Sequence, residues 1–349
     1  MPMPSDPAPP DHVLWSARLR NQLLTAPLHG DPTAVVRHLL AVQAQDPRAM
    51  RLAVRSRTIG LTAADVDRAL TDDRSLVVTW LNRGTLHLVA AEDHWWLHQL
   101  TAHRQLNWNR TRLAQEGVTP VQAQRGVELV ATAVADGPRT RHELRAVLDD
   151  AGLPTAGQAL VHILIAASLD GEVVRGPIVD GQMAFVATSG WLGPRPAPLD
   201  PTEALARLAA RYLAAHAPAT ATDLAKWAGV TLTHARAGLA ALDLPPEGLC
   251  GAAASVDGSA GWPAPRLLGG FDPILHGWAD RTFVTGTHRT IVTTNGLFRP
   301  IALVEGRAVA TWRLADGCLT IDPLEPIDPD TRAALDADAE AVLRYLALA

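Results

Sequence analysis

The stretch that decides the fold is 140-TRHELRAVLDDAGLPTAGQALVHILIAASLDGEVVRGPIVDGQMAFVAT-188. Thr140 is a favourable N-cap and begins one predicted helix, and a second helix follows over 155–169. A hairpin comes next, with strands over 172–175 and 182–188 that are punctuated by Gly-Pro and Asp-Gly turns. Two short helices followed by a hairpin are typical of a winged-helix unit.

The same order of elements occurs earlier in the chain and again, in part, later. In the first unit, predicted helices precede two strands, in the order 12–26, a helix capped by Asp31-Pro32, 48–59, Thr62–Leu70, 76–80 and 83–89. The segment TATDL at 220–224 parallels TRHEL at 140–144, and a helix over 232–242 follows it without an evident wing. We therefore expect a mainly α protein with β hairpins (α+β), built from tandem winged-helix units with a β-containing C-terminal segment.

This organisation predicts five regions. They are a disordered tail at 1–10, winged-helix unit 1 with a connecting helix at 11–120, winged-helix unit 2 at 121–195, winged-helix unit 3 at 196–245, and a linker plus a β-rich C-terminal segment at 246–349. Within the last region we expect strands at 283–284, 290–294, 301–305 and 308–312, and a final helix over 331–346.

The composition is that of an ordinary globular protein, with 48% hydrophobic and 19% charged residues. No run of about 18 apolar residues is present, as a membrane span would need. The two cysteines, Cys250 and Cys318, are far apart and lack metal-type spacing, which favours a reducing, cytoplasmic setting.

The net charge of -5 is unevenly distributed along the chain. Residues 1–145 carry 17 Arg against 14 Asp and Glu, a net +3, and the remainder carries 14 basic and 22 acidic residues, a net -8; together these give -5. Such asymmetry favours an anionic partner for the first half, although solvated helix faces would also account for it.

The segment Gln43-Ala44-Gln45-Asp46-Pro47 is the most informative for chemistry. Pro47 disfavours a helical conformation at Asp46, so the preceding residues should be extended. In an extended segment Gln43 and Gln45 project to the same side, whereas in a helix they would diverge. Two neutral amides can both donate and accept, and could together hold one water or one sugar. A polar loop that merely caps a helix is the alternative.

Several motifs give this chain its resemblance to a known family. They are Gln43-Ala44-Gln45, the turn Arg83-Gly84-Thr85-Leu86-His87, the segment 268-LGGFDPILHGWADR-281 and the segment 295-NGLFRP-300. On these residues the chain resembles the AlkZ/YcaQ-type winged-helix DNA glycosylases over nearly its whole length, in the AlkZ-like branch with Gln-x-Gln.

The resemblance implies that Gln43 and Gln45 are the catalytic pair. It also implies hydrolysis of the N-glycosidic bond of cationic alkylpurines in double-stranded DNA, above all N7-alkylguanine, including bulky adducts and interstrand crosslinks, to leave an abasic site. The AlkZ-like branch is associated with self-resistance in producers of DNA-alkylating antibiotics. No cofactor and no metal are implied, and we expect a monomer in the nucleoid. Asp46 as a general base remains an alternative.

Other residues have predicted supporting roles. Arg48, Arg51 and Arg55 follow the glutamines at helical spacing and are expected to contact phosphates. Arg83, Thr85 and His87 alternate on a predicted strand, and would line the nucleotide path or hold the wing to the core. Asp272, Asp280 and Arg281 are expected to form an ion-pair network that supports the site.

The only lysine, Lys226, lies in a predicted helix and is expected on an open surface. Because a glycosylase that also cuts the strand needs an amine nucleophile, this predicts a monofunctional enzyme that uses water. His94 and His98 have i,i+4 spacing, but no third ligand follows them, so zinc is not expected. The alternatives are a non-enzymatic winged-helix transcription regulator, which would bind an operator as a dimer, and a protein-interaction scaffold.

Overall fold

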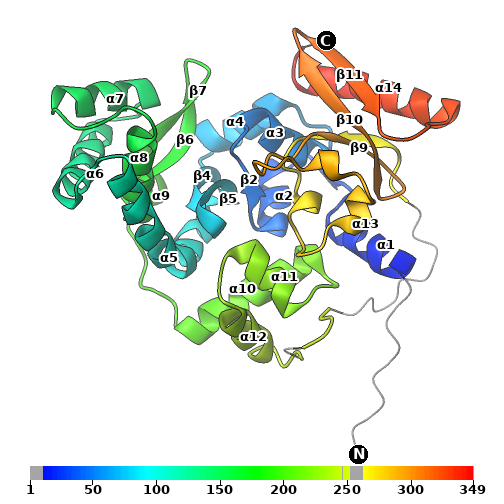
Figure 1. Ribbon diagram of the computed structural model, residues 1–349, viewed down its shortest axis with the longest axis horizontal. Coiled ribbons are helices and arrows are strands. Elements are labelled where there is room, and N and C mark those ends of the chain that lie inside the picture. The colour runs from blue at the N-terminus through cyan, green and yellow to red at the C-terminus, as the bar shows by residue number, and fades with distance from the viewer. Residues whose placement is uncertain (1–10, 246, 252–261, 349) are drawn as a thin grey trace, which may run out of the picture.

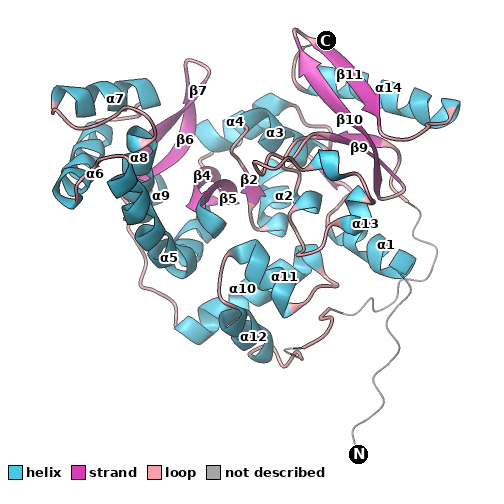
Figure 2. Cartoon of the chain, viewed as in Figure 1, coloured by secondary structure: helices cyan, strands magenta, loops and turns pink. Residues whose placement is uncertain are grey.

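The computed structural model describes residues 11–245, 247–251 and 262–348 (Figures 1 and 2). Its α-helices are α1 Asp11–Asn21, α2 Pro32–Leu39, α3 Pro47–Arg55, α4 Ala63–Thr71, α5 His94–Gln115, α6 Pro120–Ala135, α7 Arg141–Asp150, α8 Ala159–Leu169, α9 Thr188–Leu192, α10 Pro201–His216, α11 Ala221–Ala228, α12 Leu232–Ala240, α13 Thr282–Thr285 and α14 Pro329–Tyr345. Short 3-10 turns are η1 Asn82–Gly84, η2 Ala91–Asp93, η3 Pro273–Leu275 and η4 Arg289–Ile291. None of the described helices has the length and apolarity that a membrane crossing requires.

The described strands form three sheets. They are β1 Leu28–His29, β2 Val42–Gln43, β3 Thr58–Ile59, β4 Leu76–Leu81, β5 Thr85–Ala90, β6 Val173–Val179, β7 Gln182–Ala187, β8 Arg266–Leu268, β9 Ile301–Val304, β10 Arg307–Ala315 and β11 Cys318–Pro323. Strands β1 and β3 pair in parallel, a second sheet has the order β2-β5-β4-β6-β7, and a third has the order β11-β10-β9-β8.

Both hairpins expected in the first half of the chain are confirmed, but they share one sheet. The β4–β5 hairpin closes through η1, where Arg83 and Gly84 have φ of 58° and 74°. The β6–β7 hairpin joins it because β4 pairs with β6 at Val78 and Arg175. The two hairpins that were predicted as separate wings therefore form one continuous sheet. This sheet fixes α2–α4 relative to α5–α8.

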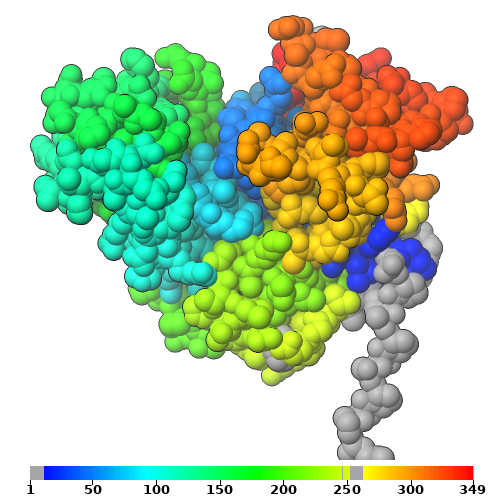
Figure 3. All heavy atoms as spheres, viewed as in Figure 1, coloured from blue at the N-terminus to red at the C-terminus, as the bar shows by residue number. Residues whose placement is uncertain are grey.

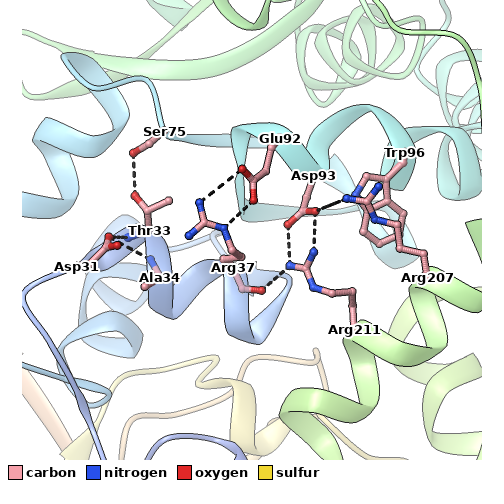
Figure 4. A network of polar contacts seen from close by, with 10 residues as sticks. All are labelled: Asp31, Thr33, Ala34, Arg37, Ser75, Glu92, Asp93, Trp96, Arg207 and Arg211. Carbon is pink, nitrogen blue, oxygen red and sulfur yellow. Dashed lines mark hydrogen bonds and ion pairs between the residues drawn. The ribbon is translucent and has the colours of Figure 1, made fainter.

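Helices α10–α12 pack beneath this sheet, as the lime segment at the bottom of Figure 1 shows. The attachment is electrostatic as well as apolar. The buried carboxylate of Asp93 accepts hydrogen bonds from the Arg211 guanidinium at 2.8 and 2.9 Å and from Trp96 Nε1 at 2.8 Å (Figure 4). A buried carboxylate needs such partners, so this contact anchors α10 to the start of α5.

The C-terminal region differs from the expectation in where its strands lie. Segments 283–284 and 290–294 are not strands: α13 covers the first, and η4 and its flanking turns cover much of the second. Asp280 accepts hydrogen bonds from the backbone N–H and the hydroxyl of Thr282, which favours a helical turn there. Two strands that sequence reasoning missed, β8 and β11, complete the sheet on which α14 packs.

The mainly α class with β hairpins is confirmed, while the tandem winged-helix assignment remains a prediction. The expected tail at 1–10 and much of the expected linker lie outside the described residues. The described part of the third unit includes an isolated bridge between Ala219 and Cys250. Figure 3 shows the α6–α8 lobe and the β10–β11 lobe standing on either side of the blue N-terminal segment, with cyan, lime and gold segments meeting in the middle of this face.

Candidate active site

Gln43 and Gln45 lie on one side of an extended segment, as predicted. Leu40, with φ 68°, ends α2, and β2 then pairs Gln43 with His87 of β5. The Ala44 side chain is buried in the core on the opposite side. Gln43 Nε2 donates to Gln45 Oε1 at 2.5 Å, so the two amides are in direct contact. The predicted convergence of the pair is confirmed.

The two amides differ in their surroundings. Gln43 is 9% exposed, whereas Gln45 is exposed. The side-chain carbonyl oxygen of Gln43 is buried, and it has no hydrogen-bond partner among the described residues. Since an unpaired buried acceptor is costly, this oxygen is an open position for an O–H donor such as a water or a sugar hydroxyl.

The glutamines open into a pocket of about 250 Å³, hereafter the glutamine pocket. It is formed where β2, η1, β5 and α11 meet the two C-terminal segments that carry the family-like motifs. Its lining residues are Gln43, Gln45, Arg83, Thr85, Lys226, His276, Trp278, Arg281, Gly296 and Phe298. Segments far apart in the sequence therefore build one site around the amide pair.

The turn η1 and strand β5 contribute in a different way from the prediction. Arg83 belongs to the turn and not to the strand, and its Nη1 donates to the carbonyl of Trp227 at 2.6 Å. Thr85 lines the pocket and donates from its hydroxyl to Asn82 O. His87 is buried beneath the glutamines, and does not line the pocket.

His87 is a buried and neutral side chain. The carbonyl of Thr85 can only accept, so the Nδ1–H of His87 donates to it, at 2.9 Å. Burial, and then the charge of Arg83, lower the pKa of His87 to about 3. The uncharged ring lies opposite Gln43 in the sheet register, which favours the alternative of holding the wing to the core over contact with DNA.

Two of the three arginines expected on phosphates are engaged within the protein. Arg51 forms an ion pair with Asp67 at 2.6 Å, and Arg55 forms one with Asp338 of α14 at 2.5 Å. All four side chains are no more than one-third exposed, so the guanidinium groups are held by these carboxylates. These ion pairs favour a structural role for Arg51 and Arg55 over the predicted phosphate contact. Arg48 is exposed, and within the described residues its side chain donates to the Leu314 carbonyl alone, at 3.3 Å.

The expected network of Asp272, Asp280 and Arg281 is not formed. Asp272 is fully buried, and both its oxygens accept from Arg57, at 2.8 and 2.9 Å. Asp272 also caps η3 through the N–H of Ile274, so it supports the segment that leads to the pocket. Asp280 accepts from the N–H of Thr282, the first residue of α13, and the Arg281 guanidinium lies 4.9 Å from the Phe298 ring centroid.

Asp46 has a capping role. Its Oδ1 accepts from the N–H groups of Arg48 and Ala49 at 2.8 and 3.2 Å, which starts α3 and fixes the end of the glutamine segment. Asp46 is not among the residues that line the pocket, which argues against its use as a base.

Sequence reasoning missed or misplaced five residues of the pocket, namely Lys226, His276, Trp278, Gly296 and Phe298. Lys226 lines it and its Nζ donates to the Ala279 carbonyl at 3.0 Å, which corrects the expectation of a lysine away from any site. His276, Trp278 and Phe298 lie inside the quoted motifs, which were the only signal that could have pointed to them. Burial, followed by the charges of Arg83 and Arg281, lowers the pKa of His276 well below its usual value, so its ring is neutral.

His94 and His98 lie away from the pocket. Their rings are 5.7 Å apart and buried with Trp95, and burial is the main reason that their pKa values fall to about 3 and about 4. They are packing residues of the α5 N-terminus.

Comparisons with known proteins agree on one family. A match to the family described as "DNA glycosylase AlkZ-like" covers residues 36–345. The chain is 27% identical over 357 residues to the "Interstrand DNA cross-link repair glycosylase" of Streptomyces sahachiroi, covering 95% of each chain. Among solved structures, the Streptomyces sahachiroi DNA glycosylase AlkZ has the same fold, with a TM-score of 0.76, 24% identity and coverage of 97% and 96% of the two chains.

Proposed function

Because this chain belongs to the AlkZ-like family of DNA glycosylases, we propose that it hydrolyses the N-glycosidic bond of cationic alkylpurines in duplex DNA and leaves an abasic site. N7-alkylguanine is the principal substrate of this proposal. Membership of an enzyme family sets aside the alternatives of a transcription regulator and of a protein scaffold.

The observation that carries the proposal is the amide pair. Gln43 and Gln45 touch each other on one side of an extended segment, and the buried carbonyl of Gln43 lacks a donor. One water that donates to this oxygen would be held beside the sugar that enters the pocket. Two neutral amides orient a water without being strong bases.

The chemistry suits a substrate whose base is already a good leaving group. Alkylation at N7 makes the base a cation, and bond cleavage releases it as a neutral molecule. The leaving group then needs little general-acid help, and the neutral rings of His87 and His276 fit a site without a strong acid. An unmodified purine lacks this charge and stays attached.

The proposal extends to how the chain meets DNA. We assign the tandem helix-hairpin units as winged helices that hold phosphates of the duplex, with Arg48 and the arginines of the pocket as contacts, and the enzyme acts as a monomer in the nucleoid. The Streptomyces relative is named for interstrand cross-link repair. We therefore include cross-linked and bulky N7-alkylguanines among the substrates, and protection of a toxin producer among the roles.

Incubation with a duplex that carries a single N7-methylguanine tests the proposal. The wild-type enzyme should produce alkali-labile sites at the lesion. Changing both Gln43 and Gln45 to Ala should slow base release by about 10²-fold or more, the range for loss of a positioned proton-transfer group. Gln124→Ala, an exposed glutamine of α6, is the matched control and should retain the wild-type rate. Wild-type turnover by the double variant would refute the assignment.

A monofunctional mechanism is part of the proposal, and Lys226 makes it testable. An imine-forming enzyme is trapped on DNA by borohydride. Since the Lys226 side chain is exposed and donates to the Ala279 carbonyl, we expect water and not this amine to attack. Borohydride added during turnover should give no covalent complex, and one that disappears in Lys226→Gln would contradict the monofunctional mechanism.

A further inference from the structure

The glutamine pocket is lined by three cationic side chains and by no carboxylate. Arg83, Lys226 and Arg281 all border it. The nearby acids have other hydrogen-bond partners: Asp280 accepts from the backbone N–H and the hydroxyl of Thr282, and Asp223 accepts from the backbone N–H of Thr220 and Ala279 at 2.8 Å. Within the described residues, none of the three cations forms an ion pair.

These cations have neutral partners only. Arg83 donates to the carbonyl of Trp227, and Lys226 to that of Ala279, while the Arg281 guanidinium lies against the face of Phe298. A carbonyl or an aromatic ring satisfies some donors but does not cancel a net charge. Most N–H donors of Arg281 and two of the three on Lys226 remain for another acceptor.

The pocket cations act on one another and on neighbouring groups, although Asp280 offsets part of the charge of Arg281. Burial, and then the charge of Arg281, lower the pKa of Arg83. The same two guanidinium groups, after burial, are the largest causes of the lowered pKa of His276. A low-dielectric cleft with one sign of charge concentrates this field.

A positive pocket discriminates between the parts of an alkylated nucleotide. The alkylated base carries a positive charge, so the pocket repels it, while the flanking phosphodiester is an anion that Arg and Lys bind well. At about 250 Å³ the pocket is also smaller than the roughly 300–1,000 Å³ usual for a ligand site, which leaves little room for a bulky adduct.

We propose that the glutamine pocket is a phosphodiester site: Lys226 and Arg281 bind a phosphate that flanks the lesion, and the cationic base stays outside. This inference rests on the proposed function and specifies how the substrate is held. The bound phosphate places its sugar against Gln43 and Gln45 while the base remains in or near the duplex. It also balances the three cations, which would otherwise disfavour the positive charge that develops on the sugar.

The arrangement accounts for substrates that a base-flipping pocket would reject. A base that is tied to the opposite strand cannot rotate into an enclosed site. An enzyme that grips the backbone and leaves the base outside has no such restriction. The size of the adduct then has little influence on binding in the pocket.

A binding measurement without a damaged base tests the phosphate site independently of catalysis. The probe is a fluorescent duplex with one tetrahydrofuran abasic analogue, in which the phosphate on its 5′ or 3′ side is either normal or a neutral methylphosphonate. For wild type, methylphosphonate on one of the two sides should weaken binding about tenfold, the effect of losing one charge-assisted hydrogen bond or more.

In Lys226→Gln this sensitivity should fall from about tenfold to about threefold, because one of the two cations that bind the phosphate is gone while Arg281 remains. Arg332→Gln, which removes an exposed arginine of α14, is the charge-matched control and should keep the full sensitivity. The inference is overturned if the wild-type protein binds the normal and the methylphosphonate duplexes equally well. It is also overturned if Lys226→Gln loses as much affinity on methylphosphonate substitution as the wild type does. If the proposed function is wrong, the wild-type protein releases no base from DNA that contains N7-methylguanine, and this outcome is separate from both binding results.

Discussion

Removing the buried carboxylate of Asp272 should lower the free energy of unfolding more than substituting any exposed residue. Asp272 and Arg57 are both fully buried, and two hydrogen bonds of 2.8 and 2.9 Å join them. Asp272→Ala leaves the Arg57 guanidinium uncompensated in the interior, where loss of one partner of a buried ion pair costs about 3–5 kcal/mol. The N-cap of η3 is lost too, for about 1 kcal/mol.

Urea unfolding followed by far-ultraviolet circular dichroism measures this cost. With a dependence on urea of about 3 kcal/mol per molar, a loss of about 4 kcal/mol lowers the midpoint by more than 1 M. Asp272→Asn keeps one acceptor oxygen and should lose less. The double variant Arg57→Met, Asp272→Leu removes both charges and should recover most of the stability, since apolar replacement of a buried pair is often neutral.

The reasoning fails if Asp272→Ala unfolds within about 0.3 M urea of wild type, or if the double variant is as unstable as the single one. The first result would mean that the guanidinium finds water or another acceptor. The second would mean that shape complementarity, and not charge, dominates the site.

Three further predictions concern single features. Because the pKa of folded His87 is about 3, against about 6.5 unfolded, the unfolded state binds the extra proton between these values. The free energy of unfolding should therefore fall as pH drops below about 6.5, and His87→Leu should flatten this slope by up to about 1.4 kcal/mol per pH unit in urea titrations. In Gly229→Ala, a Cβ at φ +71° would lie 2.8 Å from Arg83 N, so we expect a loss of about 1–2 kcal/mol in stability and slower base release; unchanged values for both would contradict this. Arg48→Gln should weaken binding to duplex DNA and lower by about one the slope of log K against log salt concentration. Arg55→Gln should lower stability and leave that slope unchanged. Fluorescence anisotropy measures the slope, and the reversed pattern would refute the two assignments.

The parts of the structure that follow from local sequence were predictable. Pro47 restricts its neighbour, so the extended glutamine segment could be inferred before any contact was known. Apolar segments on both sides of the turns at Gly84 and Gly181 predicted the two hairpins. Those hairpins nevertheless join into one sheet through Val78 and Arg175, a pairing that only the packing of helices far apart in the chain decides.

What could not be predicted depends on partners that are distant in sequence. The pair Phe283-Val284 is short and apolar, a pattern that strand and helical turn share, and the cap at Asp280 decides between them. Arg55 forms an ion pair with Asp338, which is 283 residues away in the sequence, and no local sequence pattern predicts such a partner. Lys226 reaches the glutamines only because α11 packs against η1.

The pairing of charges, more than their number, determines where this acidic protein can hold DNA. Many arginines are matched to a carboxylate within the fold, among them Arg51, Arg55 and the buried Arg57, so their charges are cancelled at short range. At physiological ionic strength the Debye length is about 8 Å, and the excess acids of exposed surfaces are screened beyond it. In the described part of the chain, Arg83 and Arg281 lack such a match, and they border the same pocket. A net charge of -5 is therefore compatible with a local anion site, since the phosphate supplies the missing partner.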